Sequence, residues 1–104
     1  MNYTISQLPE VEQEVIEAVL WYEIQNVGLG DELFMMIDEK INEVITNPLQ
    51  FEIVFKNVRR AIVKKFPYSL FYIIDERKII IIAIIHQSRN PEIWKKRIKN
   101  IDKK

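Results

Sequence analysis

The sequence predicts a two-layer α+β domain, in which a helical hairpin packs on a mainly antiparallel four-stranded sheet. Apolar residues recur every three to four positions in the first half of the chain and every second position in much of the second half. The four prolines and two glycines fall between these periodic segments. A length of 104 residues without a repeat or linker favours one domain over residues 1–104, in the order strand, helix, helix and three strands.

The first half predicts one strand and two helices. Residues 2–6 alternate polar and apolar side chains and contain β-favouring types, which predicts a short strand. Residues 9 to about 26 have the apolar spacing of an amphipathic helix, and the proline that opens it suits a first turn. The glycine-containing break at 27–30 ends this helix, and Asp31 is the expected cap of a second helix that ends near Asn47-Pro48. So short a connection predicts an antiparallel pair.

The second half predicts three strands and a short helix. After an expected loop over 48–55, a period of two predicts strands at 58–66, 68–74 and 78–86. Pro67 ends the first of these strands or forms a bulge, and we expect the strand at 2–6 to lie beside the last one. Residues 91–101 can form a short C-terminal helix. The side chains of one strand face are predicted to be core: Phe66, Tyr68, Leu70, Tyr72 and Ile74.

The run at 79–85 is apolar at both parities, so both faces of that strand require cover. Two helices cover only one face of a sheet. Either the C-terminal segment or a partner protein must therefore supply the second layer.

Composition excludes several classes of function. The chain has no cysteine, which excludes disulfide frameworks, thiolate metal sites and cysteine nucleophiles. Its one histidine and scattered carboxylates show no metal-ligand spacing, and we expect no cofactor. The longest apolar run falls far short of the roughly 20 residues that a membrane span needs. Because the first residues show no basic start followed by an apolar stretch, we expect a soluble, cytoplasmic protein.

The formal net charge of zero averages two halves of opposite sign. Residues 1–52 hold eleven acidic side chains and one basic one, whereas residues 53–104 hold fourteen basic and four acidic ones. The basic half suits nucleic acid or an acidic protein as partner. The alternative is that the halves neutralise each other across the fold.

Six short motifs, in this order, resemble those of the RelE/ParE superfamily of bacterial toxins. The resemblance spans about Tyr3 to Arg97. The motifs are Trp21-Tyr22-Glu23, Gly28-Leu29-Gly30, Asn47-Pro48, Val58-Arg59-Arg60, Phe66-Pro67-Tyr68 and the segment from His86 to Trp94.

This resemblance implies the toxin of a type II toxin–antitoxin pair, neutralised by a cognate antitoxin, with plasmid stabilisation as an associated role. The superfamily divides into RelE-like, ribosome-dependent mRNA endoribonucleases and ParE-like poisons of DNA gyrase. RelE-like members typically carry an arginine where Ser69 follows Tyr68, and a tyrosine or histidine near the C-terminus where this chain has Trp94. Serine brings no positive charge to a phosphate, and an indole N–H does not exchange a proton as an acid or base. These departures favour the ParE-like branch and a protein that is not an enzyme.

Two alternatives stay open. As a metal-independent endoribonuclease, the chain would use His86 as general acid or base and Arg89 as phosphate clamp. As a non-toxic remnant of the fold, it would only bind its antitoxin, or bind DNA together with it.

The resemblance and the charge pattern together supply candidate binding residues. For a target such as gyrase, or the ribosome and mRNA, they are Arg59, Arg60, Lys64, Arg89, Trp94, Lys95, Lys96 and Arg97. For the antitoxin they are Trp21, Tyr22, Ile80, Ile82 and Ile84. The alternative for Trp21 and Tyr22 is core or edge packing, for Trp94 it is a staple that holds the C-terminal segment to the sheet, and for the terminal lysines it is a solvated helix face.

Overall fold

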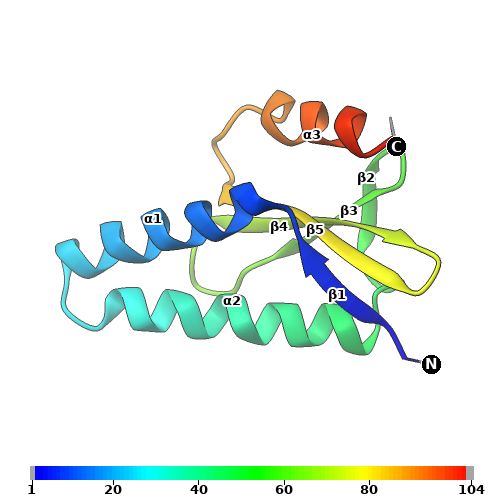
Figure 1. The fold of residues 1–104 in the computed structure, drawn as a ribbon. Coiled ribbons are helices and arrows are strands. Elements are labelled where there is room, and N and C mark those ends of the chain that lie inside the picture. The colour runs from blue at the N-terminus through cyan, green and yellow to red at the C-terminus, as the bar shows by residue number, and fades with distance from the viewer. Residues whose placement is uncertain (1, 103–104) are drawn as a thin grey trace.

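The computed structural model describes residues 2–102, which form an α+β domain with a five-stranded sheet (Figure 1). The elements in order are β1 (Thr4–Gln7), α1 (Pro9–Gln25), α2 (Leu29–Thr46), β2 (Glu52–Phe55), β3 (Val58–Ile62), β4 (Tyr68–Asp75), β5 (Lys78–His86) and α3 (Glu92–Asp102). The strand order is β1-β5-β4-β3-β2, with β1 parallel to β5 and the other pairs antiparallel. The predicted fold class and the position of the first strand beside the last are therefore confirmed.

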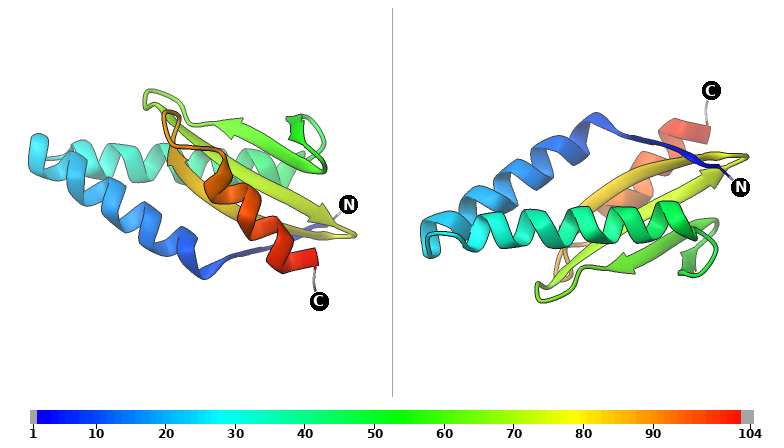
Figure 2. Two further views of the ribbon diagram at one scale, coloured as in Figure 1. Left: turned by 90° about the horizontal axis from the view of Figure 1, so that it is seen from above. Right: turned by 90° about the horizontal axis from the view of Figure 1, so that it is seen from below.

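Helices cover both faces of the sheet: the α1–α2 hairpin lies on one side and α3 on the other (Figures 1 and 2). The larger core, between hairpin and sheet, includes Val11, Leu33, Ile37, Val44, Leu70, Tyr72, Ile79, Ile81 and Ile84. The smaller core, under α3, includes Val58, Phe71, Ile73, Ile82, Ala83, Ile85, Trp94 and Ile98. The predicted core stripe lies in the larger core, where Tyr68 and Ile74 are partly buried.

The second layer over the apolar run at 79–85 comes from the chain itself. A register shift between Phe71 and Tyr72 places Phe71 opposite Ala83 and Tyr72 opposite Ile81, so Ile82 is an extra residue on β5. Because of this bulge, Ile82 and Ala83 both belong to the core under α3, whereas Ile84 returns to the hairpin side. Of the two predicted sources of cover, the C-terminal segment is the one observed.

The expectation of a loop over 48–55 was wrong at its end, because β2 extends the sheet by a fifth strand. Glu52 pairs with Arg60 and Ile53 with Arg59 on β3. The Arg59 guanidinium also donates to the carbonyls of Leu49 (3.1 Å) and Phe51 (2.6 Å), which fixes the preceding turn. Four residues with a register shift are too short to show a period of two.

The turn before β2 is also anchored from the core. The Tyr72 hydroxyl donates to the Pro48 carbonyl at 2.6 Å, and burial raises the pKa of Tyr72 to about 12. Its phenol therefore stays protonated and keeps this hydrogen bond at neutral pH.

The expected cap of the second helix, Asp31, was also wrong, because α2 begins at Leu29 after Gly28. Gly28 has φ 93°, a left-handed conformation that glycine adopts without strain. The Glu23 carboxylate, from α1, accepts the N–H groups of Gly28 (2.9 Å) and Gly30 (3.0 Å). A side chain of the preceding helix thus replaces the local cap that the sequence indicated.

Two strand boundaries also differ from prediction. Strand β3 ends at Ile62 rather than at Phe66, and the turn that follows includes Lys65 with φ 69°. Strand β1 occupies 4–7 instead of 2–6, since the Thr4 and Leu8 N–H groups bond to the carbonyls of Arg77 and Ile81 along β5.

Gly30 lies where α1 and α2 approach closely. A Cβ at this position would lie 2.5 Å from the Val19 carbonyl oxygen and 2.9 Å from Glu23 Cβ. We expect Gly30→Ala to lower the free energy of unfolding by about 2 kcal/mol, because a backbone atom cannot yield without moving the helices apart. Urea denaturation measures this. Gly28→Ala is the matched comparison: its Cβ meets nothing within 4 Å, so its cost comes from the left-handed φ alone, about 1 kcal/mol. Equal costs for the two variants would contradict the predicted close approach.

Candidate binding site at the end of β5

His86 and Arg89 form a ridge between two surface hollows at the end of β5. The hollow toward α1, about 200 Å³, is lined by Glu14, Glu17, Ala18, Trp21, Tyr68, Ile84, Ile85, His86 and Arg89. The hollow toward α3, about 130 Å³, is lined by Val54, Arg60, Phe71, Ile85, His86, Gln87, Arg89, Pro91 and Trp94. The two residues singled out from the sequence are thus brought together, and both face both hollows.

The ridge is held by hydrogen bonds that the turn after β5 makes within itself and to the residue before β4. The Gln87 N–H donates to the Pro67 carbonyl (2.8 Å) and the Arg89 N–H to the His86 carbonyl (3.0 Å). The Asn90 side-chain oxygen accepts the Glu92 N–H at 2.9 Å, which begins α3. This turn fixes the backbone that carries Arg89, whose side chain is exposed.

The hydrogen bonds of His86 define its tautomer. Its Nδ1 accepts the Ser88 backbone N–H at 3.0 Å, and the Ser88 hydroxyl lies 2.8 Å from the same atom. A neutral imidazole carries one proton, so that proton is on Nε2. The ring therefore presents an N–H donor, not a free lone pair, at its other nitrogen.

Tyr68 lies directly opposite His86 across the β4–β5 pair. Their rings meet edge to face with centroids 5.4 Å apart. Burial, with Tyr22 as a lesser cause, raises the pKa of Tyr68, and Arg89 partly offsets this. The phenol is therefore neutral at physiological pH and carries a proton that it can donate to a ligand.

Arg60 and Arg89 place two guanidinium groups around the hollow toward α3. Arg60 forms an ion pair with Glu52 through one terminal nitrogen, while its Nε is buried without a hydrogen-bond partner among the described residues. Two cations and an unsatisfied donor suit a carboxylate or phosphate group. Ser69, the position at which RelE-like proteins typically carry arginine, is only 2% exposed and contributes no charge here.

The other predicted target-binding residues lie apart from the ridge or inside the fold. Arg59 binds the turn before β2, and Lys64 pairs with Glu39 and Glu43 on α2. On α3, Trp94 is buried and Lys95 lies over the Phe55 ring, 4.5 Å from its centroid. Arg97 pairs with Glu14 of α1, whereas Lys96 is exposed.

The predicted antitoxin-binding residues are divided among different surroundings. Trp21 is 56% exposed and lines the hollow toward α1, while Tyr22 packs against Phe66 with ring centroids 5.1 Å apart. Ile80 is half-buried beneath α3, Ile82 is buried there, and Ile84 is buried on the opposite face of the sheet.

Sequence reasoning missed Tyr68, Glu17 and Ser88 as members of this site. In an unbulged hairpin closed by the pair Asp75–Lys78, Tyr68 would lie opposite Ile85; the bulge moves it to His86. Ser88 carries a recognisable signal, because a serine two residues after a histidine can donate to its ring.

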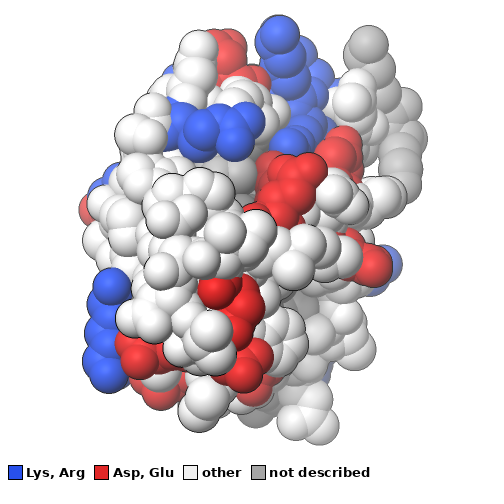
Figure 3. All heavy atoms as spheres, turned by 90° about the vertical axis from the view of Figure 1, so that its left-hand side faces the viewer, with Lys and Arg blue, Asp and Glu red and all other residues white. Residues whose placement is uncertain are grey.

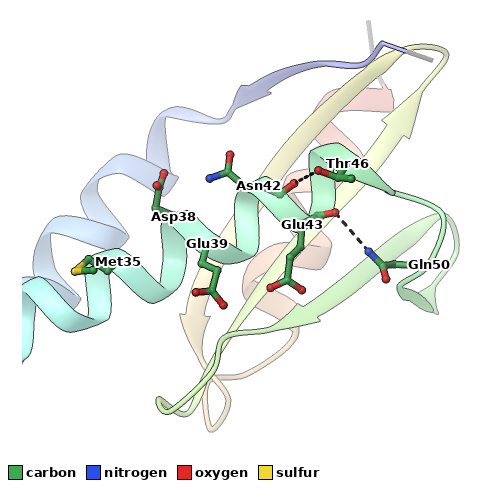
Figure 4. Close-up of a pocket in the computed structure, with 7 residues that line it drawn as sticks. All are labelled: Met35, Asp38, Glu39, Asn42, Glu43, Thr46 and Gln50. Carbon is green, nitrogen blue, oxygen red and sulfur yellow. Dashed lines mark hydrogen bonds between the residues drawn. The ribbon is translucent and has the colours of Figure 1, made fainter.

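A third hollow, about 600 Å³, is a shallow acidic surface along α2 (Figure 4). It contains Asp38, Glu39 and Glu43, but residues 2–102 hold no group of three or more His, Cys, Asp or Glu side chains suited to a metal ion. Within the same range, no helix is long and apolar enough to cross a membrane.

Comparison with known proteins identifies relatives by sequence pattern and by fold. Residues 5–91 match the family described as ParE toxin of type II toxin-antitoxin system, parDE. No curated protein matches the sequence. A chain from the chromosomal ParDE toxin–antitoxin system of P. aeruginosa superposes with a TM-score of 0.72 at 12% identity, covering 81% of this chain and 95% of that one. A mutant of the E. coli toxin RelE in the free state superposes with a TM-score of 0.69 at 18% identity, covering 97% and 99%.

Proposed function

The chain belongs to the ParE toxin family of type II toxin–antitoxin systems, and on this premise we propose that it inhibits growth by binding DNA gyrase through the His86–Arg89 ridge. A cognate antitoxin neutralises it, in line with the ParDE system of its structural neighbour. The site of action is the bacterial cytoplasm, where gyrase works.

The hydrogen bond from the Ser88 N–H to His86 Nδ1 is the observation that carries this proposal. A general base must offer a lone pair to the hydroxyl proton it removes. In His86, Nδ1 already accepts a hydrogen bond and Nε2 carries the proton. The neutral ring therefore offers an N–H donor to a ligand and no free lone pair. Together with the neutral phenol of Tyr68, it suits recognition of an acceptor group better than RNA cleavage.

A second candidate, the RelE-like endoribonuclease, is favoured by one feature. Arg60, His86 and Arg89 line the same hollow, and two guanidinium groups there can hold a phosphate of RNA. On this alternative, His86 must release its bond to Ser88 before it can accept a proton.

We expect purified protein to inhibit gyrase supercoiling and Arg89→Ala to weaken that inhibition at least tenfold, because an exposed guanidinium at the centre of the ridge is lost. A supercoiling assay over a range of toxin concentrations measures both. Arg77→Ala, an exposed arginine in the β4–β5 turn, removes the same charge elsewhere and should change inhibition less than twofold.

His86→Gln separates the two candidates. Glutamine can place an N–H donor near the position of Nε2 but provides no base, so gyrase inhibition should fall less than for His86→Ala. The protein would be the nuclease instead if the wild type cleaved mRNA on translating ribosomes and did not inhibit gyrase. In that case both His86 variants should lose the cleavage. Normal growth after expression of folded protein would indicate the non-toxic remnant.

A further inference from the structure

The hollow toward α3 combines an apolar floor with a basic rim. Phe71, Ile85 and Trp94 are buried members of its lining, whereas Arg89 is exposed and Arg60 is half-buried. Arg60 lies opposite Phe71 across the β3–β4 pair, and the Phe71 ring stacks on Trp94 with centroids 4.7 Å apart. Since opposite residues of an antiparallel pair share a face, the Arg60 side chain lies on the side of the sheet that α3 covers.

The two hollows beside the ridge differ in charge. Glu14 and Glu17 line the hollow toward α1, but none of the nine described residues that line the hollow toward α3 is acidic. His86 belongs to both linings, and its neutral ring adds an uncharged N–H donor. An anion that binds beside the ridge therefore meets carboxylates on the α1 side and only cations and neutral groups in the described lining on the α3 side.

The fold uses only part of the hydrogen-bonding capacity of Arg60. One terminal nitrogen pairs with Glu52, whose side chain is 60% exposed, while Nε is buried without a partner among residues 2–102. The side chain of Arg60 is itself 39% exposed, so a terminal nitrogen remains within reach of a ligand. A guanidinium group binds two oxygens of one anion in parallel, and Arg89 offers a second such group at the same hollow.

The size of the hollow discriminates between carboxylate and nucleic-acid phosphate. Its volume is about 130 Å³, and Phe71 and Trp94 form much of its wall. A phosphate within a nucleic acid carries a sugar on each side, whereas a carboxylate ends the side chain of aspartate or glutamate. The carboxylate can therefore enter a small hollow while its methylene stem packs on the apolar wall, which adds the free energy of apolar burial.

The surrounding surface also lacks the charge pattern of a nucleic-acid site. Arg60, Lys64 and Arg97 each form an ion pair with a glutamate from residues 1–52. Figure 3 looks onto the end of the molecule at which β5 finishes and shows basic side chains in separate groups, with uncharged and acidic side chains between them. Affinity for DNA comes from several cations that contact neighbouring phosphates together, so this surface suits an acidic protein better.

We propose that the hollow toward α3 receives the carboxylate of an aspartate or glutamate on the surface of gyrase, held between Arg60 and Arg89. This proposal rests on the proposed function only in assigning the carboxylate to gyrase. The toxin then recognises the protein of the gyrase–DNA complex through this hollow, and a DNA phosphate is the competing occupant.

The first test needs no gyrase and uses the two tryptophans of the chain as reporters. Trp94 lines the hollow toward α3 and Trp21 the hollow toward α1. The probe is a blocked five-residue peptide with glutamate at its centre and alanine elsewhere. In proton–nitrogen NMR spectra at 0.15 M salt, it should shift the indole N–H signal of Trp94 in a saturable way and that of Trp21 at least fivefold less.

Matched probes and variants define the recognition. The same peptide with glutamine in place of glutamate, and a 12-nucleotide oligothymidylate, should each shift Trp94 at least fivefold less than the glutamate peptide does. Arg60→Gln should abolish the shift, and Arg89→Gln, at an exposed position, should weaken it at least fivefold even if Arg60→Gln perturbs the fold. Arg77→Gln, in the β4–β5 turn, should change it less than twofold.

Three results would overturn the proposal. An equal shift from the glutamine peptide would show that charge is not recognised, and a larger shift from the oligonucleotide would identify a phosphate site. A shift that is larger at Trp21 than at Trp94 would place the anion in the hollow toward α1.

The second test locates the carboxylate on gyrase. A carbodiimide activates a carboxylate, and a neighbouring lysine amine then displaces the resulting urea to form an amide bond. Arg89→Lys places such an amine at the hollow and keeps the charge. In the complex with gyrase, position 89 should be linked to an aspartate or glutamate of gyrase at least fivefold more than position 77 in Arg77→Lys, as measured by mass spectrometry.

Failure of this proposal differs from failure of the proposed function. Equal linkage at positions 89 and 77 in a toxin that inhibits gyrase would overturn the assignment of the carboxylate and leave gyrase as the target. The expected shift of Trp94 in a protein that does not inhibit gyrase would support the carboxylate site and count against gyrase alone.

Discussion

Replacement of Arg97 by methionine is expected to lower the free energy of unfolding by about 3 kcal/mol, because it leaves the Glu14 carboxylate partly buried without its cation. The two side chains are 14% and 15% exposed, and Arg97 Nη2 lies 2.7 Å from Glu14 Oε2. Arg97 also donates to the Ile82 carbonyl at 2.8 Å, and Glu14 accepts the Ile84 N–H at 3.2 Å. Strand β1 ends before this stretch of β5, so the ion pair takes over the hydrogen bonding of the strand edge and joins α1, β5 and α3.

A double-mutant cycle with Glu14→Gln and Arg97→Met measures the coupling between the two side chains by urea denaturation. We expect the double variant to be more stable than the sum of the single losses predicts, by about 1 to 2 kcal/mol. Lys64→Met is the control, because Lys64 is 62% exposed in its pair with Glu39. This substitution should lower the free energy of unfolding by less than about 1 kcal/mol. A coupling energy near zero would contradict the buried pair.

The parts of the fold that the sequence predicted well are those with many repeats of one period. Helix α1 and strand β5 begin at the predicted residues, because their apolar spacing continues over 17 and 9 residues. The predictions of strand β2 and of the start of α2 failed for a different reason. Both depend on groups outside the segment itself, namely Arg59 and Arg60 on β3 for the first and the Glu23 carboxylate of α1 for the second.

The candidate site was only partly predictable for the same reason. His86 and Arg89 are close in sequence, and a histidine at the end of a predicted strand can be recognised from the sequence alone as a candidate site residue. The tyrosine opposite His86 depends on the bulge at Ile82, which no local pattern announces in a run that is apolar at every position. The sequence predicts Arg97 and Trp94 as candidate target contacts, but Arg97 is paired with Glu14 of α1, 83 positions earlier in the chain, and Trp94 faces the sheet.

Trp94→Ala is expected to lower the free energy of unfolding by about 3 to 4 kcal/mol, because it removes the main contact between α3 and the sheet. Trp94 is 5% exposed and stacks on Phe71 with centroids 4.7 Å apart and planes at 21°. Phe55 of β2 meets it edge to face at 5.9 Å. Trp94→Phe keeps part of this stacking and should cost about 1.5 kcal/mol.

Trp21 supplies the matched control, since it is 56% exposed and Trp21→Ala should cost less than 1 kcal/mol. Urea denaturation compares the variants, and a Trp21→Phe background makes Trp94 the only fluorophore of its kind, so its emission reports the docking of α3. Loss of Trp94 should also increase binding of a hydrophobic dye, because α3 is the element that covers Ile82, Ala83 and Ile85. If Trp94→Ala cost no more than Trp21→Ala, α3 would contribute little to the cover of β5, and that face of the sheet would again require a partner.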